Sequence, residues 1–267
     1  MPSRAANTSR APAVAGLFYP LERDALRRDV SGYLAAVPAR GPMPKAIVVP
    51  HAGYVYSAAV AAAAYGRLRD GAANVTRVVL LGPSHRVAFR GVALPAADAF
   101  ATPLGSVPID AAAREVLSRR PEVVVADGAH RHEHSLEVQL PFLQAVLDAF
   151  TLLPIVIGDA SAEAVAGLLD DVWGGRETLI VVSTDLSHYN AYAHALRVDA
   201  LTCRRIAALD PVLEGEDACG CIGVNALLLA AKRRGLVATQ LAACNSGDTA
   251  GDRARVVGYA AFGFYPR

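Results

Sequence analysis

The most regular feature of this chain is a series of short, continuous runs of hydrophobic residues, many of them β-branched. Such runs are typical of strands that are covered on both faces of a sheet, whereas a half-exposed strand alternates hydrophobic and polar residues. The pattern predicts strands over residues 45–49, 76–81, 91–95, 122–126, 151–157, 178–183, 236–243 and 255–264.

Segments in which hydrophobic residues recur at helical spacing separate most of these runs. They predict helices over residues 21–36, 57–69, 108–119, 135–149, 161–172, 191–209 and 218–234. Pro141 should kink or restart the fourth of them. The alternation predicts an α/β fold, a three-layer sandwich in which helices flank a largely parallel or mixed central sheet. No linker or internal repeat divides the chain, so we expect one domain over residues 1–267, with residues 1–12 as a loose tail.

Composition and charge exclude several classes of protein. The formal net charge of +1 gives no broad field that would attract nucleic acid or an anionic membrane. No hydrophobic run approaches the roughly 18 residues that cross a bilayer, and the polar N-terminus does not resemble a secretory signal. We therefore expect a cytoplasmic protein that binds neither nucleic acid nor membrane. The cysteines form no C-x-x-C pair, which fits a reducing compartment.

Polar side chains that can bind a metal follow four of the predicted strands. His51 and His85 follow the first two strands, Asp185 and His188 follow the strand over 178–183, and Cys244 follows the strand over 236–243. In open α/β sheets, ligands bind outside the carboxyl ends of the strands. We therefore expect these side chains to converge on one cleft.

The chemistry of these side chains indicates a metal site. Two neutral imidazoles and one anionic side chain form a three-point site with open positions. If Cys244 is the third ligand beside His51 and His85, Zn²⁺, Cu⁺ and Fe²⁺ compete for the site, and Asp185 and His188 serve as acid–base or outer groups. The alternative makes Asp185 the ligand and leaves Cys244 as a nearby thiol. The residues alone do not distinguish the two.

A second group of histidines lies in the stretch "AHRHEHSLEVQLPFL", residues 129–143. His134 and Glu137 are the members that we expect to act in the site, and the alternative interpretation is a solvated loop before a helix. Tyr54 and Arg86 are candidate substrate contacts because each lies close in sequence to a predicted histidine ligand. Cys219, at the start of the last predicted helix, is either a packing residue or a thiol with a lowered pKa.

Several separated motifs resemble those of one known family. The motifs "PHAGYVYS", "LGPSH", "EHSLEVQLPFL", "STDLSHY" and "CNSGD" occur in the order found in the Memo-like family, whose microbial members are called AmmeMemoRadiSam system protein B. The resemblance runs from residue 13 to residue 265. That family is similar in fold to the catalytic subunits of class III extradiol dioxygenases, which are non-heme Fe(II) enzymes.

The resemblance implies a metal site and a set of functional residues. By this resemblance, His51, His85 and Cys244 match the metal-binding positions of the family. A thiol is not expected in the dioxygenases, and it argues against ring cleavage because a thiolate ligand changes the metal and is itself oxidisable. We expect a redox enzyme that uses Fe(II), or alternatively copper or zinc. The expected catalytic residues are Asp185, His188 and His134, and the expected substrate contacts are Tyr54, Arg86 and Glu137.

Two other functions and several partners follow from the same residues and the same resemblance. The site could bind a metal or a peptide without turnover, or it could be that of a zinc hydrolase, in which an open zinc position activates water. The expected ligand is a small molecule or a peptide in the metal pocket. The resemblance also implies a radical-SAM protein and an AMMECR1-like protein as partners, and the oligomeric state is left open.

Overall fold

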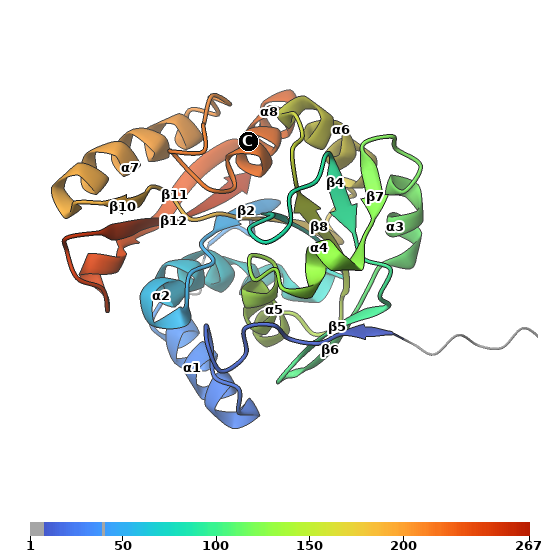
Figure 1. Ribbon diagram of the computed structural model, residues 1–267, viewed down its shortest axis with the longest axis horizontal. Coiled ribbons are helices and arrows are strands. Elements are labelled where there is room, and N and C mark those ends of the chain that lie inside the picture. The colour runs from blue at the N-terminus through green and yellow to red at the C-terminus, as the bar shows by residue number, and fades with distance from the viewer. Residues whose placement is uncertain (1–7, 39–40) are drawn as a thin grey trace, which may run out of the picture.

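The computed structural model describes residues 8–38 and 41–267 (Figure 1). A mixed sheet of nine strands, counted over these residues, forms its centre. These strands are β2 (Ala46–Val49), β3 (Arg77–Pro83), β4 (Val92–Leu94), β7 (Val123–Val125), β8 (Thr151–Ile157), β9 (Thr178–Ser183), β10 (His188–Asn190), β11 (Val237–Asn245) and β12 (Val256–Tyr265). A second, three-stranded sheet consists of β1 (Ser9–Arg10), β5 (Ala99–Thr102) and β6 (Gly105–Pro108).

Helices cover both faces of the central sheet. The α-helices are α1 (Arg23–Ala35), α2 (Tyr54–Tyr65), α3 (Ala111–Leu117), α4 (Asp127–Arg131), α5 (Leu140–Val146), α6 (Ala162–Val172), α7 (Tyr192–Ala207) and α8 (Cys221–Arg233). Three 3₁₀ segments in the described ranges are η1 (Gly66–Asn74), η2 (Glu137–Gln139) and η3 (Ser246–Asp248).

The order of the strands determines which residues meet at one edge of the sheet. The order is β10-β12-β2-β9-β3-β8-β4-β7, and β11 pairs with β12. The four strands β2, β9, β3 and β8 are parallel, whereas β12 and β4 run antiparallel to β2 and β8. The predicted largely parallel, mixed sheet is thus confirmed, and the carboxyl ends of β2, β9 and β3 lie at the same edge.

Alternate residues of each central strand pack on opposite faces, which explains the continuous hydrophobic runs. Ile47 and Val49 belong to the core that α1, α2 and α5 cover. Ala46 and Val48 belong to the core that α3, α6, α7 and α8 cover. The predicted three-layer arrangement is confirmed, and Figure 1 shows the helices on both sides of the sheet.

The structure adds several short elements to the predicted ones. The predicted strands all form, and β8 has the predicted bounds. The predicted helix over 135–149 is divided into η2 and α5, and Pro141 lies in the first turn of α5, where a missing N–H is tolerated. The pattern missed β1, β5, β6, β10 and α4, each of which has at most five residues.

The N-terminal segment differs from the predicted loose tail. Residues 1–7 lie outside the described residues. Ser9–Arg10, however, form β1, which pairs in parallel with β5. The Arg10 guanidinium is buried and donates from Nη1 to Glu137 Oε2 at 2.6 Å. The expectation is therefore wrong for β1, because one buried ion pair and a strand pairing hold this segment in place.

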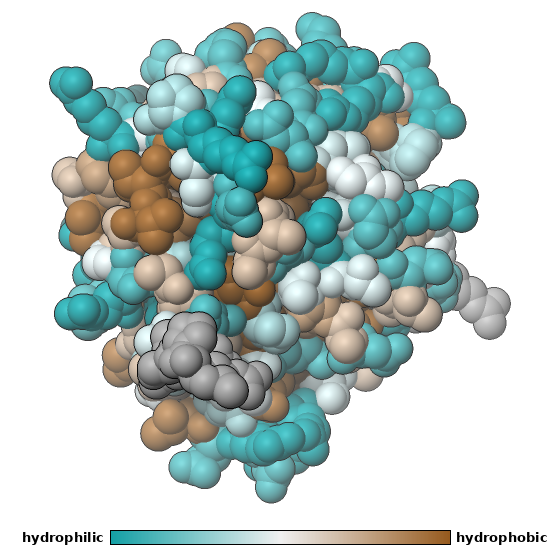
Figure 2. Space-filling model, turned by 90° about the vertical axis from the view of Figure 1, so that its right-hand side faces the viewer, coloured by the Kyte–Doolittle hydropathy of each residue, from teal (hydrophilic) through white to brown (hydrophobic). Residues whose placement is uncertain are grey.

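The described residues include no helix that is both long enough and hydrophobic enough to cross a membrane. On the face shown in Figure 2, hydrophilic side chains predominate and hydrophobic side chains form several small, separate areas. At the end of the central sheet, Val124 and Val125 of β7 are 42% and 52% exposed.

Candidate metal centre

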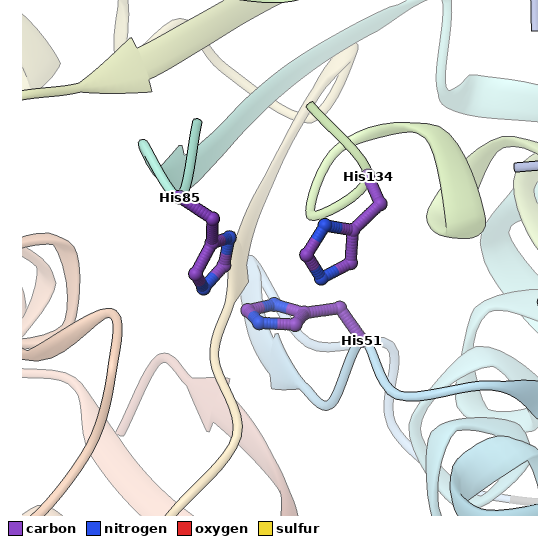
Figure 3. Close-up of side chains that lie close together, drawn as sticks. All are labelled: His51, His85 and His134. Atoms are coloured by element: carbon purple, nitrogen blue, oxygen red, sulfur yellow. The ribbon is translucent and has the colours of Figure 1, made fainter. Parts of the chain in front are cut away.

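Three histidines lie together at the carboxyl edge of the central sheet (Figure 3). His51 follows β2 after Pro50, His85 follows β3, and His134 lies between α4 and η2. One ring nitrogen of each lies within 4.8 Å of a ring nitrogen of the other two. The ring centroids are 4.6 Å apart for His85 and His134, 5.1 Å for His51 and His85, and 5.4 Å for His51 and His134. We refer to these three residues as the histidine triad.

The hydrogen bonds around His51 assign its tautomer. Gln139 Nε2 donates to the Pro50 carbonyl, which can only accept, and also to Ser183 Oγ. The Ser183 hydroxyl donates its only proton to the Ser135 carbonyl at 2.6 Å. His51 Nδ1, which is 2.9 Å from Ser183 Oγ, must therefore be the donor in that contact. This assignment leaves a lone pair on His51 Nε2.

Glu133 orients His85 in a similar way. Its carboxylate accepts from the backbone N–H groups of His85, His134 and Ser135, and it lies 2.9 Å from His85 Nδ1. Burial alone would raise the pKa of Glu133, but the hydrogen bonds from His85 and Ser135, together with the charge interaction with the His85 ring, outweigh it and lower the pKa to about 2. An ionised carboxylate only accepts, so His85 Nδ1 donates to it, and Nε2 is the ring nitrogen left to bind a ligand.

His134 completes the triad. Its buried Nδ1 lies 3.4 Å from Glu133 Oε1, but the two atoms are not aligned for a hydrogen bond, and Nδ1 has no hydrogen-bond partner among the described residues. Burial, opposed by the nearby Glu133 carboxylate, lowers the pKa of His134 to about 4. Its ring also packs against Phe18, with the centroids 4.8 Å apart. Near neutral pH, His134 is therefore an uncharged imidazole with an unsatisfied polar atom.

These features fit a transition-metal ion. Burial lowers the pKa of His51 well below its usual value, so this imidazole is also neutral, as a ligand must be. Histidine ligands commonly donate their second ring N–H to a carboxylate or another oxygen, as His85 and His51 do here. Imidazole donors suit zinc, copper, iron and nickel alike, so the triad defines a candidate metal site without selecting the ion.

Cys219 lies next to His51 at this site. Its Sγ is 3.3 Å from His51 Nε2, and it accepts from the backbone N–H of Asp185 at 3.3 Å. Burial raises the pKa of the Cys219 thiol to about 12. The S–H group can therefore donate to the lone pair of His51, and the interpretation of Cys219 as a thiol with a lowered pKa is wrong.

A cavity of about 710 Å³ opens beside the triad. Asp185 and His188, predicted from their strand-end positions, both line it. Burial raises the pKa of Asp185 to about 7, against the opposing effect of hydrogen bonds from the backbone N–H groups of His51 and Ala52. Burial lowers the pKa of His188. Asp185 is thus a carboxyl group that can gain or lose a proton near neutral pH.

Cys244 lies on a more distant strand. It pairs with Tyr259 across β11 and β12, and β12 separates β11 from β2. Cys244 is not part of the histidine triad and does not line the cavity, although it lies near the carboxyl end of β11 as predicted. Among the described residues, His134 takes the third position of the compact group for which the sequence had favoured Cys244.

The three predicted substrate contacts, Tyr54, Glu137 and Arg86, lie in different surroundings. The Tyr54 ring is buried, and its hydroxyl donates to the Val138 carbonyl at 2.8 Å. Glu137 is fully buried and accepts from Arg10, Tyr19 and the backbone N–H groups of residues 13 and 14. Arg86 is exposed, and its charge contributes to the lowered pKa of His134. None of the three lines the cavity.

Sequence reasoning missed some residues that the structure places at the site. Tyr56, Tyr189, Arg255 and Tyr259 line the cavity. Tyr56 and Tyr189 lie within the motifs "PHAGYVYS" and "STDLSHY", and this membership is the signal that could have indicated them. Glu133 lies in the same stretch as Glu137, the glutamate that the sequence analysis favours.

The fold and the triad together define an α/β protein with a histidine-lined candidate metal centre. Comparison with known proteins adds the family. The family profile described as "Memo-like protein" matches residues 10–263. The chain therefore belongs to the Memo-like family, as its motifs predict.

Relatives of nearly full length agree with this assignment. A MEMO1 family protein of Aquifex aeolicus is 35% identical over 265 residues, which cover 94% of this chain and 97% of that protein. One of Methanopyrus kandleri is 35% identical over 281 residues, covering 96% and 98% of the two chains. A crystal structure of an uncharacterized protein from Escherichia coli K12 aligns with a TM-score of 0.48 and 12% identity, over 82% of this chain and 99% of that one.

Proposed function

We propose that this protein is a metal-dependent redox enzyme that holds Fe(II), or alternatively copper, at the histidine triad. The observation that supports the proposal is the convergence of three imidazoles, two of them held by a hydrogen bond at Nδ1, beside a cavity of about 710 Å³. A bound iron or copper ion would supply one-electron and O₂ chemistry. The substrate is a small molecule that fits this cavity.

The residues around the triad have separate roles in this proposal. Ser183 and Glu133 hold the Nδ1–H groups of His51 and His85, which leaves Nε2 of each ring to bind the ion; at His51 the ion would replace the contact with the Cys219 thiol. Asp185 lies in the cavity with a pKa of about 7, and it can accept or return a substrate proton. His188 lines the same cavity as a second candidate proton carrier.

A zinc hydrolase is the second candidate, and the composition of the triad favours it. Three histidines with an open fourth position are a known ligand set of catalytic zinc, which lowers the pKa of a bound water to near 7. In that case Asp185 would accept the proton of the water. Binding of a metal or a peptide without turnover is the third alternative, and the radical-SAM and AMMECR1-like partners stay predictions from the sequence.

The first experiment tests the ligands. Protein purified anaerobically would be analysed for metal by mass spectrometry, as wild type and as His51→Ala, His85→Ala and His134→Ala. We expect about one ion per chain in the wild type. In each variant, the metal affinity should fall by more than the roughly 10–100-fold that follows removal of a residue hydrogen-bonded to a ligand. His132→Ala is the matched control, because His132 is an exposed histidine of the same loop.

The same measurement decides the role of Cys244. If Cys244→Ser lowers the metal content as much as His134→Ala does, the thiolate belongs to the ligand set and the three-histidine assignment is incomplete. Unchanged metal content in all three histidine variants contradicts the proposal. Substrate-dependent O₂ uptake by the iron form then supports the redox enzyme, ester hydrolysis by the zinc form supports the hydrolase, and turnover by neither supports a binding module.

A further inference from the structure

Arg255 stands at the cavity beside the triad without a carboxylate partner. It lies one residue before β12 and lines the cavity. No ion pair within the described ranges involves its guanidinium, whereas Arg253 lies 4.0 Å from an Asp248 carboxylate oxygen. Asp252, which also lines the cavity, accepts at Oδ1 from the backbone N–H groups of Ala254 and Arg255. Because no carboxylate of the described residues pairs with it, the Arg255 guanidinium can meet a ligand.

A strained tyrosine holds this guanidinium in place. Tyr189 has φ of 59°, a left-handed conformation that is uncommon for a bulky residue. Its neighbours His188 and Asn190 pair with Val257 and Val256 of β12, and the register shifts between them. The Arg255 guanidinium carbon lies 5.0 Å from the centre of the Tyr189 ring, within cation–π distance.

Strain of this kind points to function rather than to stability. A bulky residue in the left-handed region is energetically unfavourable and persists where the surroundings impose it, often at ligand sites. Tyr189 is 64% exposed, so its burial does not explain the conformation. Tyr189 and Arg255 both line the cavity, so the strained residue and the guanidinium above its ring lie at a candidate ligand site.

The charge of the site favours an anion. Neutral imidazoles contribute no negative charge, so a divalent ion at the triad would keep its full charge. The two carboxyl groups that line the cavity are both engaged by backbone N–H groups, Asp185 with His51 and Asp252 with residues 254 and 255. A ligand that carries its own negative charge therefore suits both the ion and Arg255.

We propose that the cavity takes small molecules with two anionic groups, one directed at the histidine triad and the other held by Arg255 above Tyr189. The inference rests on the proposed metal site and names the class of its substrate. A planar guanidinium binds a carboxylate through two parallel hydrogen bonds, which makes Arg255 the residue that determines specificity for the distal group. A cavity of about 710 Å³ accommodates such a molecule.

The test uses the full-length protein loaded with Co²⁺, whose visible absorption reports ligands that enter the metal site. The probes are acetate, which has one carboxylate, and malonate, succinate and glutarate, which have two at increasing separation. We expect at least one dicarboxylate to bind more tightly than acetate. In Arg255→Gln its affinity should fall about tenfold or more, as expected for loss of a charged hydrogen bond, while acetate affinity stays the same.

Two further variants serve as controls. Arg255→Lys keeps the charge and should restore part of the dicarboxylate affinity. Arg253→Gln removes an exposed arginine two residues away that does not line the cavity, and it should have no effect. Equal dicarboxylate affinity in the wild type and Arg255→Gln, or no preference of the wild type over acetate, overturns the inference while the metal site stands. Absence of Co²⁺ binding before any anion is added contradicts the metal site itself, and the inference then falls with it.

Discussion

Glu133 is the carboxylate with the most hydrogen bonds to residues of the histidine triad, and its replacement tests the electrostatic reasoning directly. The side chain is 2% exposed and accepts hydrogen bonds from the backbone N–H groups of His85, His134 and Ser135, and from the His85 ring. Glu133→Gln keeps the size of the side chain and one carbonyl oxygen. It removes the charge and places an amide donor where an N–H group of His85 now donates.

The magnitude follows from the pKa of Glu133. In the folded protein it is about 2, against an ordinary value of 4.5. At 1.36 kcal/mol per pH unit, this difference corresponds to a stabilisation of about 3 kcal/mol. Because the folded-state pKa is the lower one, this stabilisation is complete above pH 4.5 and is lost as the pH falls toward 2. We therefore expect Glu133→Gln to lower the free energy of unfolding by about 3 kcal/mol at pH 7 and by less than half of that near pH 3.

Urea-induced unfolding of metal-free protein measures both values, and Glu115→Gln is the control. Glu115 is an exposed glutamate whose partner Arg119 is exposed as well, so its replacement should change stability by less than about 0.5 kcal/mol. Metal affinity gives a second readout, since His85 loses its orienting partner and a reduction of roughly 10–100-fold is expected. A variant that matches the wild type in stability at pH 7 and in metal affinity would show that Glu133 neither stabilises the loop nor orients His85.

Three further variants test other parts of the structure by urea-induced unfolding. Arg10→Met leaves the buried Glu137 carboxylate without its cation and should lower stability by about 3–5 kcal/mol; a change below about 1 kcal/mol would contradict a structural role for this pair. Gly91→Ala places a Cβ against the Glu122 carbonyl at a φ of 81°, and a loss of at least about 1–2 kcal/mol is expected; an unchanged midpoint argues against this conformation. Asp185→Asn should have the same stability as the metal-free wild type near pH 4. As the pH rises to 7 it should become the more stable protein, by at most about 4 kcal/mol, because the pKa of Asp185 is about 7 in the folded state against 3.8. A stability difference that does not vary with pH refutes the assigned pKa.

The sequence predicted the part of the site that parallel strands determine. His51, Asp185 and His85 follow β2, β9 and β3, which are neighbours and run in the same direction. Continuous hydrophobic runs identify such strands, and the end of each run marks the residue that reaches the edge of the sheet. Two of the three histidines were therefore predictable from a local pattern.

The position of Cys244 was not predictable, because strand order depends on long-range pairing. β11 has the same direction as β2, so Cys244 does lie toward the expected edge. The intervening β12 places these two strands about 10 Å apart, twice the usual spacing. No local feature of the sequence shows that β12, the last strand, inserts between them. The distinction between Glu133 and Glu137 has a similar origin, since Arg10, remote in sequence, engages Glu137.

Arg10 also shows why the start of the chain belongs to the site. Besides Glu137, its guanidinium donates to the carbonyl groups of His130 and Glu133, each at 2.6 Å. These two carbonyl groups belong to the segment that carries Glu133 and His134. Arg10 therefore fixes the loop that supplies His134 to the triad and Glu133 as the partner of His85. The segment would otherwise be a short stretch of loop, and loops of this kind are mobile unless buried contacts hold them. The geometry of the candidate metal centre therefore depends on β1 as well as on the carboxyl ends of the sheet.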